Sequence, residues 1–238
     1  MSNKNIYGPQ SSYTDVDKIL VAIDCIIFGF QDGNLKILLF KRKVAPFEKE
    51  WSLIGSFVKV SENIKEASNR ILEEITGLKG VYLKELRSYG NVSRDPGARV
   101  ISIAHYALIK IDQFQLSTSD EFESQWFNMS DMPILILDHK KMVDDALNKL
   151  RQKIKTQPIG FELLNEKFTL TELKALYDSI YGYTLDRGNF RKKILGMKIL
   201  DKMEEKDKAN SKKGAFLYKF NEQKYKALLE DGAKVDFF

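Results

Sequence analysis

The segment TLDRGNFRKKILG, residues 184–196, concentrates side chains that can bind DNA. Helical spacing places Phe190, Ile194 and Met197 on one side, which we expect to face a core, and Lys192 on the opposite side. Arginine can read guanine through two hydrogen bonds, asparagine can read adenine, lysines suit phosphates, and glycine allows close backbone approach. The DNA contacts predicted on this helix are Arg187, Gly188, Asn189, Arg191, Lys192 and Lys193.

A second helix is expected immediately before this one. Thr169 and Glu172 form a capping box, T-x-x-E, which opens it, and Gly182 is a typical residue to end it. Two short helices separated by a turn are the core of a helix-turn-helix domain.

A basic hairpin follows the two helices. Strands are expected over residues 199–203 and 214–220, and they flank the charged loop of residues 204–213. Lys212 and Lys213 lie at its tip, where a wing would contact the DNA backbone. This order of elements predicts a winged helix-turn-helix. The alternative is a solvated basic helix in a purely structural subdomain.

Charge separates the two parts of the chain. Residues 146–238 carry 20 Lys and Arg against 13 Asp and Glu, a net of +7, whereas residues 1–145 carry 18 against 20, a net of −2. A basic C-terminal part indicates a polyanionic partner for that part. A solvated basic surface remains the other interpretation.

The N-terminal part combines strands with one helix. The spacing of apolar residues predicts a helix over residues 62–75 that ends at Gly77, and Asp138 is expected to cap a helix over residues 139–155. The predicted strands are residues 18–29, 35–42, 51–55, 81–89 and 99–111, with a further short strand at Trp126 and Phe127. This pattern predicts an α/β sandwich, with domains at residues 1–155 and 156–238.

Residues 51–78, WSLIGSFVKVSENIKEASNRILEEITGL, resemble the Nudix hydrolase signature G-x5-E-x7-R-E-U-x-E-E-x-G-U, in which U is apolar. The matching residues are Glu62, Arg70, Leu72, Glu74, Gly77 and Leu78. The resemblance implies a Nudix fold for residues 1–145. It also implies the chemistry of that family, in which helix carboxylates hold Mg²⁺, which orients a diphosphate and activates water.

The departures from the signature bear on activity. Ser56 replaces the first glycine, and Ile71 and Ile75 replace two glutamates. These isoleucines are four residues apart on one helix face and provide no oxygen ligand. Glu62 and Glu74 alone would hold Mg²⁺ poorly, because it demands near-octahedral oxygen coordination. We therefore predict no metal, no cofactor, no catalytic residue and no enzyme activity.

A Nudix fold without metal ligands still has a pocket. Carboxylates and cations satisfy the hydroxyls of a sugar, and an aromatic face covers its apolar edge. The candidate effector-binding residues are Asp24, Arg42, Lys43, Trp51, Arg94, Asp95, Arg99 and His105. Several have structural alternatives: Trp51 as a core residue, Arg94 and Asp95 as a local ion pair, and His105 as a hydrogen-bonded core histidine. Cys25 is expected to be a buried, inert thiol.

The whole chain, in this order of domains, resembles the Nudix-related transcriptional regulators. The matching stretches beyond the signature are SRDPGARVISIAHYAL, ILDHKKMVDDALNKLR, FTLTELKALYDSIYG and TLDRGNFRKKIL. The resemblance implies a homodimeric regulator that binds double-stranded operator DNA, with a Nudix domain that senses a metabolite. One branch senses ADP-ribose and another L-arabinose. Overall likeness favours the L-arabinose branch and a repressor of carbohydrate metabolism.

Composition excludes other classes. A single cysteine excludes a disulfide framework or a multi-cysteine zinc site, and two histidines do not favour a His-rich metal centre. No apolar run approaches the roughly 18 residues that span a bilayer. The N-terminus lacks the apolar region of a secretory signal, so we expect a cytoplasmic protein without membrane contact.

Three functional classes remain open from the sequence. The first is a ligand-responsive repressor. The second is an active Nudix hydrolase of ADP-ribose or a similar diphosphate, with an accessory basic domain. The third is a nucleic-acid-binding protein whose Nudix part is purely structural.

Overall fold

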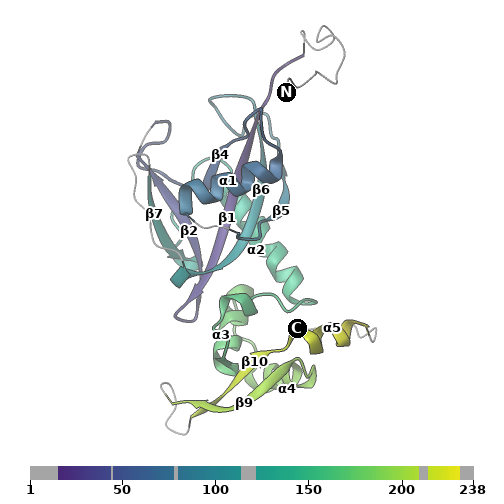
Figure 1. The fold of residues 1–238 in the computed structure, drawn as a ribbon. Helices are drawn as coiled ribbons and strands as arrows, with labels where there is room; N and C mark the ends of the chain where they lie inside the picture. Colours follow the sequence, from purple (N-terminus) through teal and green to yellow (C-terminus); the bar gives the residue numbers. More distant parts are fainter. Residues whose placement is uncertain (1–15, 44, 78–79, 114–121, 209–213, 231–238) are drawn as a thin grey trace.

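The computed structural model describes residues 16–43, 45–77, 80–113, 122–208 and 214–230. Figure 1 shows an upper unit built around a sheet, a lower unit of helices and a hairpin, and helix α2 (His139–Ile154) running from one to the other. The strands of the upper unit are β1 (Leu20–Gln31), β2 (Asn34–Arg42), β3 (Trp51–Ser52), β4 (Ile54–Phe57), β5 (Lys84–Tyr89), β6 (Val100–Lys110) and β7 (Phe122–Asn128).

Seven strands of the described residues form one mixed sheet. Its central order is β3-β2-β1-β6-β5, with β4 paired to β1 and β7 paired to β2. The hairpin β1–β2 is antiparallel, as predicted, whereas β1 and β6 are parallel. The strand predicted over residues 51–55 is divided, because β3 pairs with β2 and β4 with β1.

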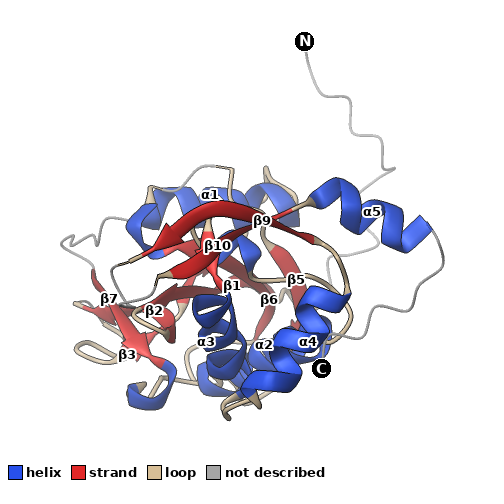
Figure 2. Cartoon of the chain, turned by 90° about the horizontal axis from the view of Figure 1, so that it is seen from below, coloured by secondary structure: helices blue, strands red, loops and turns tan. Residues whose placement is uncertain are grey.

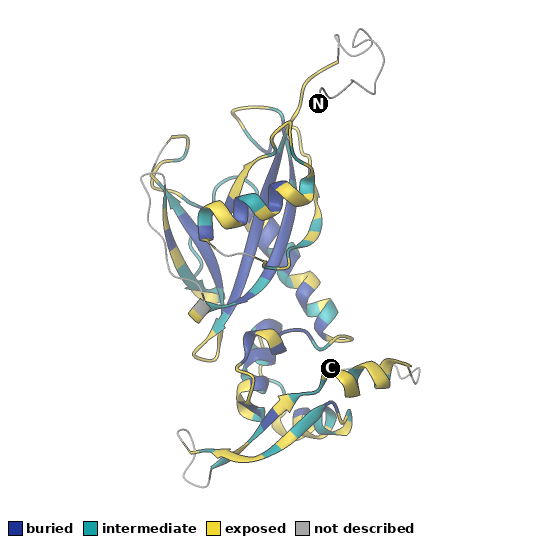
Figure 3. Cartoon of the chain, viewed as in Figure 1, coloured by how far each residue is buried: buried dark blue, intermediate teal, exposed yellow. Residues whose placement is uncertain are grey.

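Both faces of this sheet are covered, which makes the upper unit an α/β sandwich. On β1, Ile23 and Ile27 belong to the apolar cluster beneath α1 (Ile64–Thr76), whereas Ile26 and Phe28 belong to the cluster that includes α2 (His139–Ile154). Side chains of a strand alternate between faces, so a continuous apolar strand is what a sheet covered on both sides requires. Figure 3 shows the resulting buried centre of the sheet.

Helix α1 begins at Ile64, two residues later than predicted, because Asn63 caps it. The Asn63 side chain accepts from Glu66 N, and the Glu66 side chain accepts from Asn63 N, which completes a capping box. Gly77 ends the helix in the left-handed conformation, with φ of 70°, as predicted.

The start of α2 at His139 is confirmed, but the capping hydrogen bond expected from Asp138 is not formed. Asp138 stands at the N-cap position, but its side chain makes no capping hydrogen bond. Its carboxylate instead accepts two hydrogen bonds from Arg94, at 2.8 and 3.1 Å. The guanidinium of Arg94 binds the Asp138 carboxylate in place of the backbone N–H groups of α2, because charge-assisted bidentate hydrogen bonds are stronger than neutral ones.

The lower unit has the predicted order of elements. It contains β8 (Phe168–Thr169), α3 (Leu170–Tyr181), α4 (Arg187–Gly196), β9 (Leu200–Asp207) and β10 (Ala215–Phe220), followed by α5 (Glu222–Glu230), which was not predicted. The capping box of Thr169 and Glu172 and the terminal Gly182 of α3 are confirmed. In Figure 2, α3, α4 and the hairpin β9–β10 form the end of the molecule.

Two boundaries in this unit differ from the prediction. Helix α4 starts at Arg187 instead of residue 184, because the Asp186 side chain accepts from Asn189 N and caps it. Strand β9 continues through residue 207, well into the segment expected as a loop. The proposed domain division after residue 155 follows the end of α2 at Ile154.

Candidate functional sites

A cavity of about 190 Å³ lies on the α2 side of the upper sheet and is lined by residues from β1, β3, β4 and the start of α2. Asp24 on β1 is its buried carboxylate, and Ser102 on β6 donates a hydrogen bond to Asp24 Oδ2 at 2.5 Å. Arg94 Nη2 lies 3.6 Å from the same oxygen. Buried charges need such partners, since transfer from water is otherwise costly.

Gly55 on β4 explains how the chain passes so close to this carboxylate. A Cβ built at position 55 would lie 2.2 Å from Asp24 Oδ1. Real carbon and oxygen atoms do not approach that closely, so a side chain at this position would displace Asp24 and change the cavity.

His139, the first residue of α2, completes the polar floor of the cavity. Its Nδ1 accepts from Leu53 N at 3.1 Å, which leaves the ring proton on Nε2, 3.6 Å from Asp24 Oδ1. Burial lowers the pKa of His139, so the ring is neutral near pH 7. Sequence reasoning missed this residue, although a histidine beside the predicted cap of α2 was a visible signal.

The cavity gathers half of the eight predicted effector residues. Asp24, Arg42, Arg94 and Asp95 line it. Arg94 does not form the local ion pair with Asp95 that was its structural alternative. It pairs with Asp138, and Asp95 accepts from Gly97 N within its own turn.

The other four predicted residues do not line the cavity. Trp51 is half-buried and packs edge-on against Phe127, with ring centroids 4.8 Å apart, which is the role of a core residue. Arg99 donates to Val100 O. Lys43 is exposed at the end of β2.

His105, the fourth, lies on the opposite face of the sheet. It pairs in register with Cys25, whereas Asp24 pairs with Ala104, so His105 and Asp24 point to different sides. The ring of His105 donates to Ile103 O, and burial lowers its pKa. Cys25 is buried, and burial raises the pKa of its thiol, as expected for an inert cysteine.

The residual carboxylates of the Nudix signature are engaged by Arg70. This arginine donates to both oxygens of Glu62, at 2.6 and 2.7 Å, and to Glu74 at 2.9 Å. Hydrogen bonds from Arg70 lower the pKa of Glu62 to about 2. Both glutamates therefore form ion pairs with Arg70.

The two isoleucines of the signature face inward. Ile71 is fully buried in the cluster beneath α1, and Ile75 packs against it. The described residues contain no group of three or more His, Cys, Asp or Glu side chains that could hold a metal ion. The arrangement does not fit the Mg²⁺ that the Nudix signature implies.

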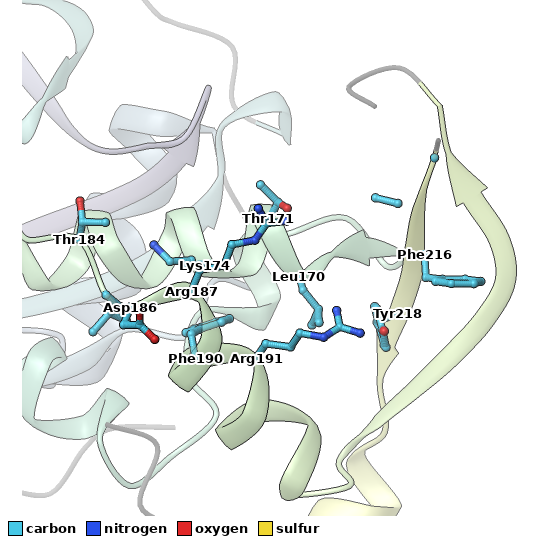
Figure 4. A pocket seen from close by; sticks show the side chains of 13 residues that line it. Leu170, Thr171, Lys174, Thr184, Asp186, Arg187, Phe190, Arg191, Phe216 and Tyr218 are labelled. Atoms are coloured by element: carbon cyan, nitrogen blue, oxygen red, sulfur yellow. The ribbon is translucent and has the colours of Figure 1, made fainter. Parts of the chain in front are cut away.

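The lower unit carries a second, larger concavity, with a volume of about 920 Å³. It lies between the N-terminal ends of α3 and α4 and strand β10, and Figure 4 shows Arg191 extending from α4 toward Tyr218. Phe190 and Ile194 hold α4 against the core, as predicted. The predicted DNA-contact residues that are exposed are Arg187, Gly188, Asn189, Arg191 and Lys192.

Lys193 is half-buried, and Lys212 and Lys213 lie outside the described residues. The described wing strands carry two further cations beside an aromatic ring. Lys202 Nζ and Lys206 Nζ lie 3.6 and 4.5 Å from the ring centroid of Phe216. No described residue belongs to a helix long and apolar enough to cross a membrane.

Comparison with known families matches both units. Residues 18–146 match the NUDIX domain, and residues 160–220 match the NrtR DNA-binding winged helix domain. The ADPR responsive transcriptional repressor NtrR of Acinetobacter baylyi is 29% identical over 228 residues, which cover 94% of this chain and 91% of that protein. ADP-ribose pyrophosphatase of Methanocaldococcus jannaschii is 36% identical over 128 residues, 53% of this chain and 72% of that enzyme.

Solved structures of NrtR from Shewanella oneidensis are similar as well. The complex with a 27mer DNA has a TM-score of 0.73 and 27% identity, covering 87% of this chain and 95% of that one. Its NUDIX domain in complex with ADP ribose has a TM-score of 0.52 and 27% identity, covering 60% of this chain and 99% of that one. The expected likeness to the L-arabinose branch is not supported by these relatives, since the names of both curated proteins and of one solved structure refer to ADP-ribose and none refers to L-arabinose.

Both units of this chain are covered by the similarity to the Acinetobacter repressor and to Shewanella NrtR, which spans 94% and 87% of the chain. The chain therefore belongs to the Nudix family, in the group that joins a Nudix domain to the winged helix domain of NrtR-type transcriptional regulators.

Proposed function

We propose that this protein is an ADP-ribose-responsive transcriptional repressor. The observation that carries the proposal is the course of α2, whose first residue His139 lines the cavity of the upper unit and whose Arg151 bonds to α3 of the lower unit. An element shared by both units gives a ligand on one and DNA on the other a physical route by which to influence each other. The named effector of the relatives supports ADP-ribose over L-arabinose.

Operator DNA is bound through α4 in this proposal. Arg187, Asn189 and Arg191 are exposed on α4, suited to base edges, and Lys192 is suited to a phosphate. We further propose a homodimer, because two recognition helices would then meet half-sites about 34 Å apart or a multiple of that spacing. Light scattering on the purified protein measures its mass and tests the dimer.

Release from DNA requires that ADP-ribose bind the free and DNA-bound conformations with different affinity. A duplex selected in vitro for tight binding would serve as the operator. Titrating ADP-ribose into this complex at fixed salt is expected to lower the fluorescence anisotropy of labelled DNA, with L-arabinose and D-xylose as comparisons. Release by L-arabinose alone would reject ADP-ribose as the effector, and no response to any of them would reject the sensing role.

Hydrolysis of ADP-ribose is the second candidate function, which the likeness to the archaeal pyrophosphatase favours. We propose that this activity is absent. Two signature positions hold isoleucines, and the remaining Glu62 and Glu74 bind Arg70.

A further inference from the structure

The cavity beside Asp24 is too small for the whole of the proposed effector. Its volume is about 190 Å³, below the roughly 300–1,000 Å³ of sites that enclose a drug-sized ligand. ADP-ribose contains an adenine, two riboses and a diphosphate, so only one end of it fits here.

A second cavity, of about 560 Å³, adjoins the first. The two share Arg94 and Leu137 as lining residues, so they lie on either side of this pair. The second cavity is lined further by Arg87, Ser88, Ser93 and Lys141. We call it the Arg87 cavity and the first the Asp24 cavity.

The two cavities differ in charge. The Asp24 cavity is lined by two carboxylates, Asp24 and Asp95, and by two arginines, Arg42 and Arg94, so its charges balance and it offers acceptors and donors to the hydroxyls of a sugar. The Arg87 cavity presents two exposed cations and two serine hydroxyls, which suit phosphate oxygens. Lys141 forms no ion pair with any described residue in the structure, so its ammonium is available.

Arg87 is held in place although its side chain is half exposed. Its guanidinium pairs with Asp145 and lies 4.8 Å from the ring centroid of Tyr89, whose hydroxyl donates to the same carboxylate at 2.8 Å. Such preorganisation lowers the entropic cost of binding an anion.

We propose that the effector occupies both cavities. Its terminal ribose, the one that ADP lacks, lies in the Asp24 cavity, and its diphosphate lies in the Arg87 cavity against Arg87 and Lys141. This inference rests on the proposed function. It has a regulatory consequence, because Leu137, Asp138 and His139, together with Lys141, then surround the ligand at the start of α2. The ligand would therefore contact the connecting helix from two sides.

Calorimetric titration of the full-length chain tests the inference, with ADP-ribose and ADP as ligands. Lys141→Ala is expected to weaken both ligands about fivefold, because each carries the diphosphate. Lys140→Ala is the matched control, since the neighbouring lysine pairs with Asp144 and lines neither cavity. Asp24→Asn is expected to weaken ADP-ribose but not ADP, which lacks the second ribose.

A second pair of variants repeats the test at Arg87. Arg87→Ala is expected to weaken both ligands, whereas Lys84→Ala, which removes a cation from the same strand and lines neither cavity, is expected to leave both affinities unchanged. Melting temperatures establish that each variant is folded. Wild-type protein that does not bind ADP-ribose would overturn the proposed function together with this inference. Normal ADP-ribose binding by both Lys141→Ala and Arg87→Ala would overturn the inference alone.

Discussion

Arg151 donates from Nε to the backbone oxygen of Ile180 at 2.7 Å, which joins the last turns of α2 and α3. The contact is tight, because a Cβ at the next glycine, Gly182, would lie 3.1 Å from Arg151 Nη2. One apolar cluster also continues through Leu150 and Ile154 of α2 into Ile180 of α3. These contacts give a physical route from α2 to α3, the helix that packs against α4 through Tyr177 and Phe190.

Arg151→Ala is expected to uncouple the two ligands while each still binds. The coupling between two sites is typically a factor of about 5–150, and we expect it to fall toward one when this bond is lost. Operator affinity measured by anisotropy with and without saturating ADP-ribose provides that factor. Lys149→Ala, at an exposed position of the same helix, is the control. An unchanged factor in Arg151→Ala would show that coupling does not use this contact.

Hydrolysis of ADP-ribose with Mg²⁺ or Mn²⁺ is expected to be absent. The physical reason is that Arg70 binds both oxygens of Glu62 and one oxygen of Glu74, while Ile71 lies in the core and provides no oxygen ligand. Chromatography of the reaction mixture would detect AMP and ribose phosphate. Metal-dependent turnover that disappears in Glu74→Gln would contradict this prediction.

Arg191→Ala is expected to cost about 1–3 kcal/mol in operator binding and to relax sequence preference, if its guanidinium reads a base. Lys226→Ala on α5 is a charge-matched control, because this lysine pairs with Glu222 away from α4. Binding isotherms on the selected duplex and on random DNA separate the two effects. Unchanged operator affinity in an Arg187→Ala, Arg191→Ala double variant would reject α4 as the recognition helix.

Gly55→Ala is expected to weaken ADP-ribose binding, because the added methyl group would displace Asp24 from the cavity floor. Gly196→Ala is a suitable control, since a Cβ there meets no atom within 4 Å. Calorimetry measures the affinity of both variants. Equal affinities would mean that the position of Asp24 does not matter for the ligand.

Acid should weaken the contribution of Glu62 to folding. Hydrogen bonds from Arg70 lower the pKa of this carboxyl from 4.5 to about 2. A depressed pKa stabilises the folded state above the unfolded value, and that stabilisation is lost as the pH falls from about 4.5 through about 2. Urea unfolding of wild type and Glu62→Gln should therefore differ most above pH 5 and converge toward pH 2. A constant difference over this range would contradict the assignment.

Local patterns were enough to predict most of the elements. The capping box of Thr169 and Glu172 and the left-handed ends at Gly77 and Gly182 depend only on neighbours in the chain, and all were predicted correctly. The Nudix signature likewise lies within one segment, so its departures at Ile71 and Ile75 were visible in the sequence. Element boundaries moved where an unrecognised cap, such as Asp186, started the helix.

The sequence by itself determined the two units, their order, and a basic helix with Arg187 and Arg191 exposed, because amphipathic spacing is a local property. Only the tertiary structure decided which polar residues meet. A strand alternates its side chains, so the register of β1 against β6 placed Ser102 beside Asp24 and His105 on the other face. No pattern along the chain encodes that register. The bond between Arg94 and Asp138, which are 44 residues apart, is not visible in any local pattern either. Contacts of this kind follow from how the strands and α2 pack, and they shape the cavity.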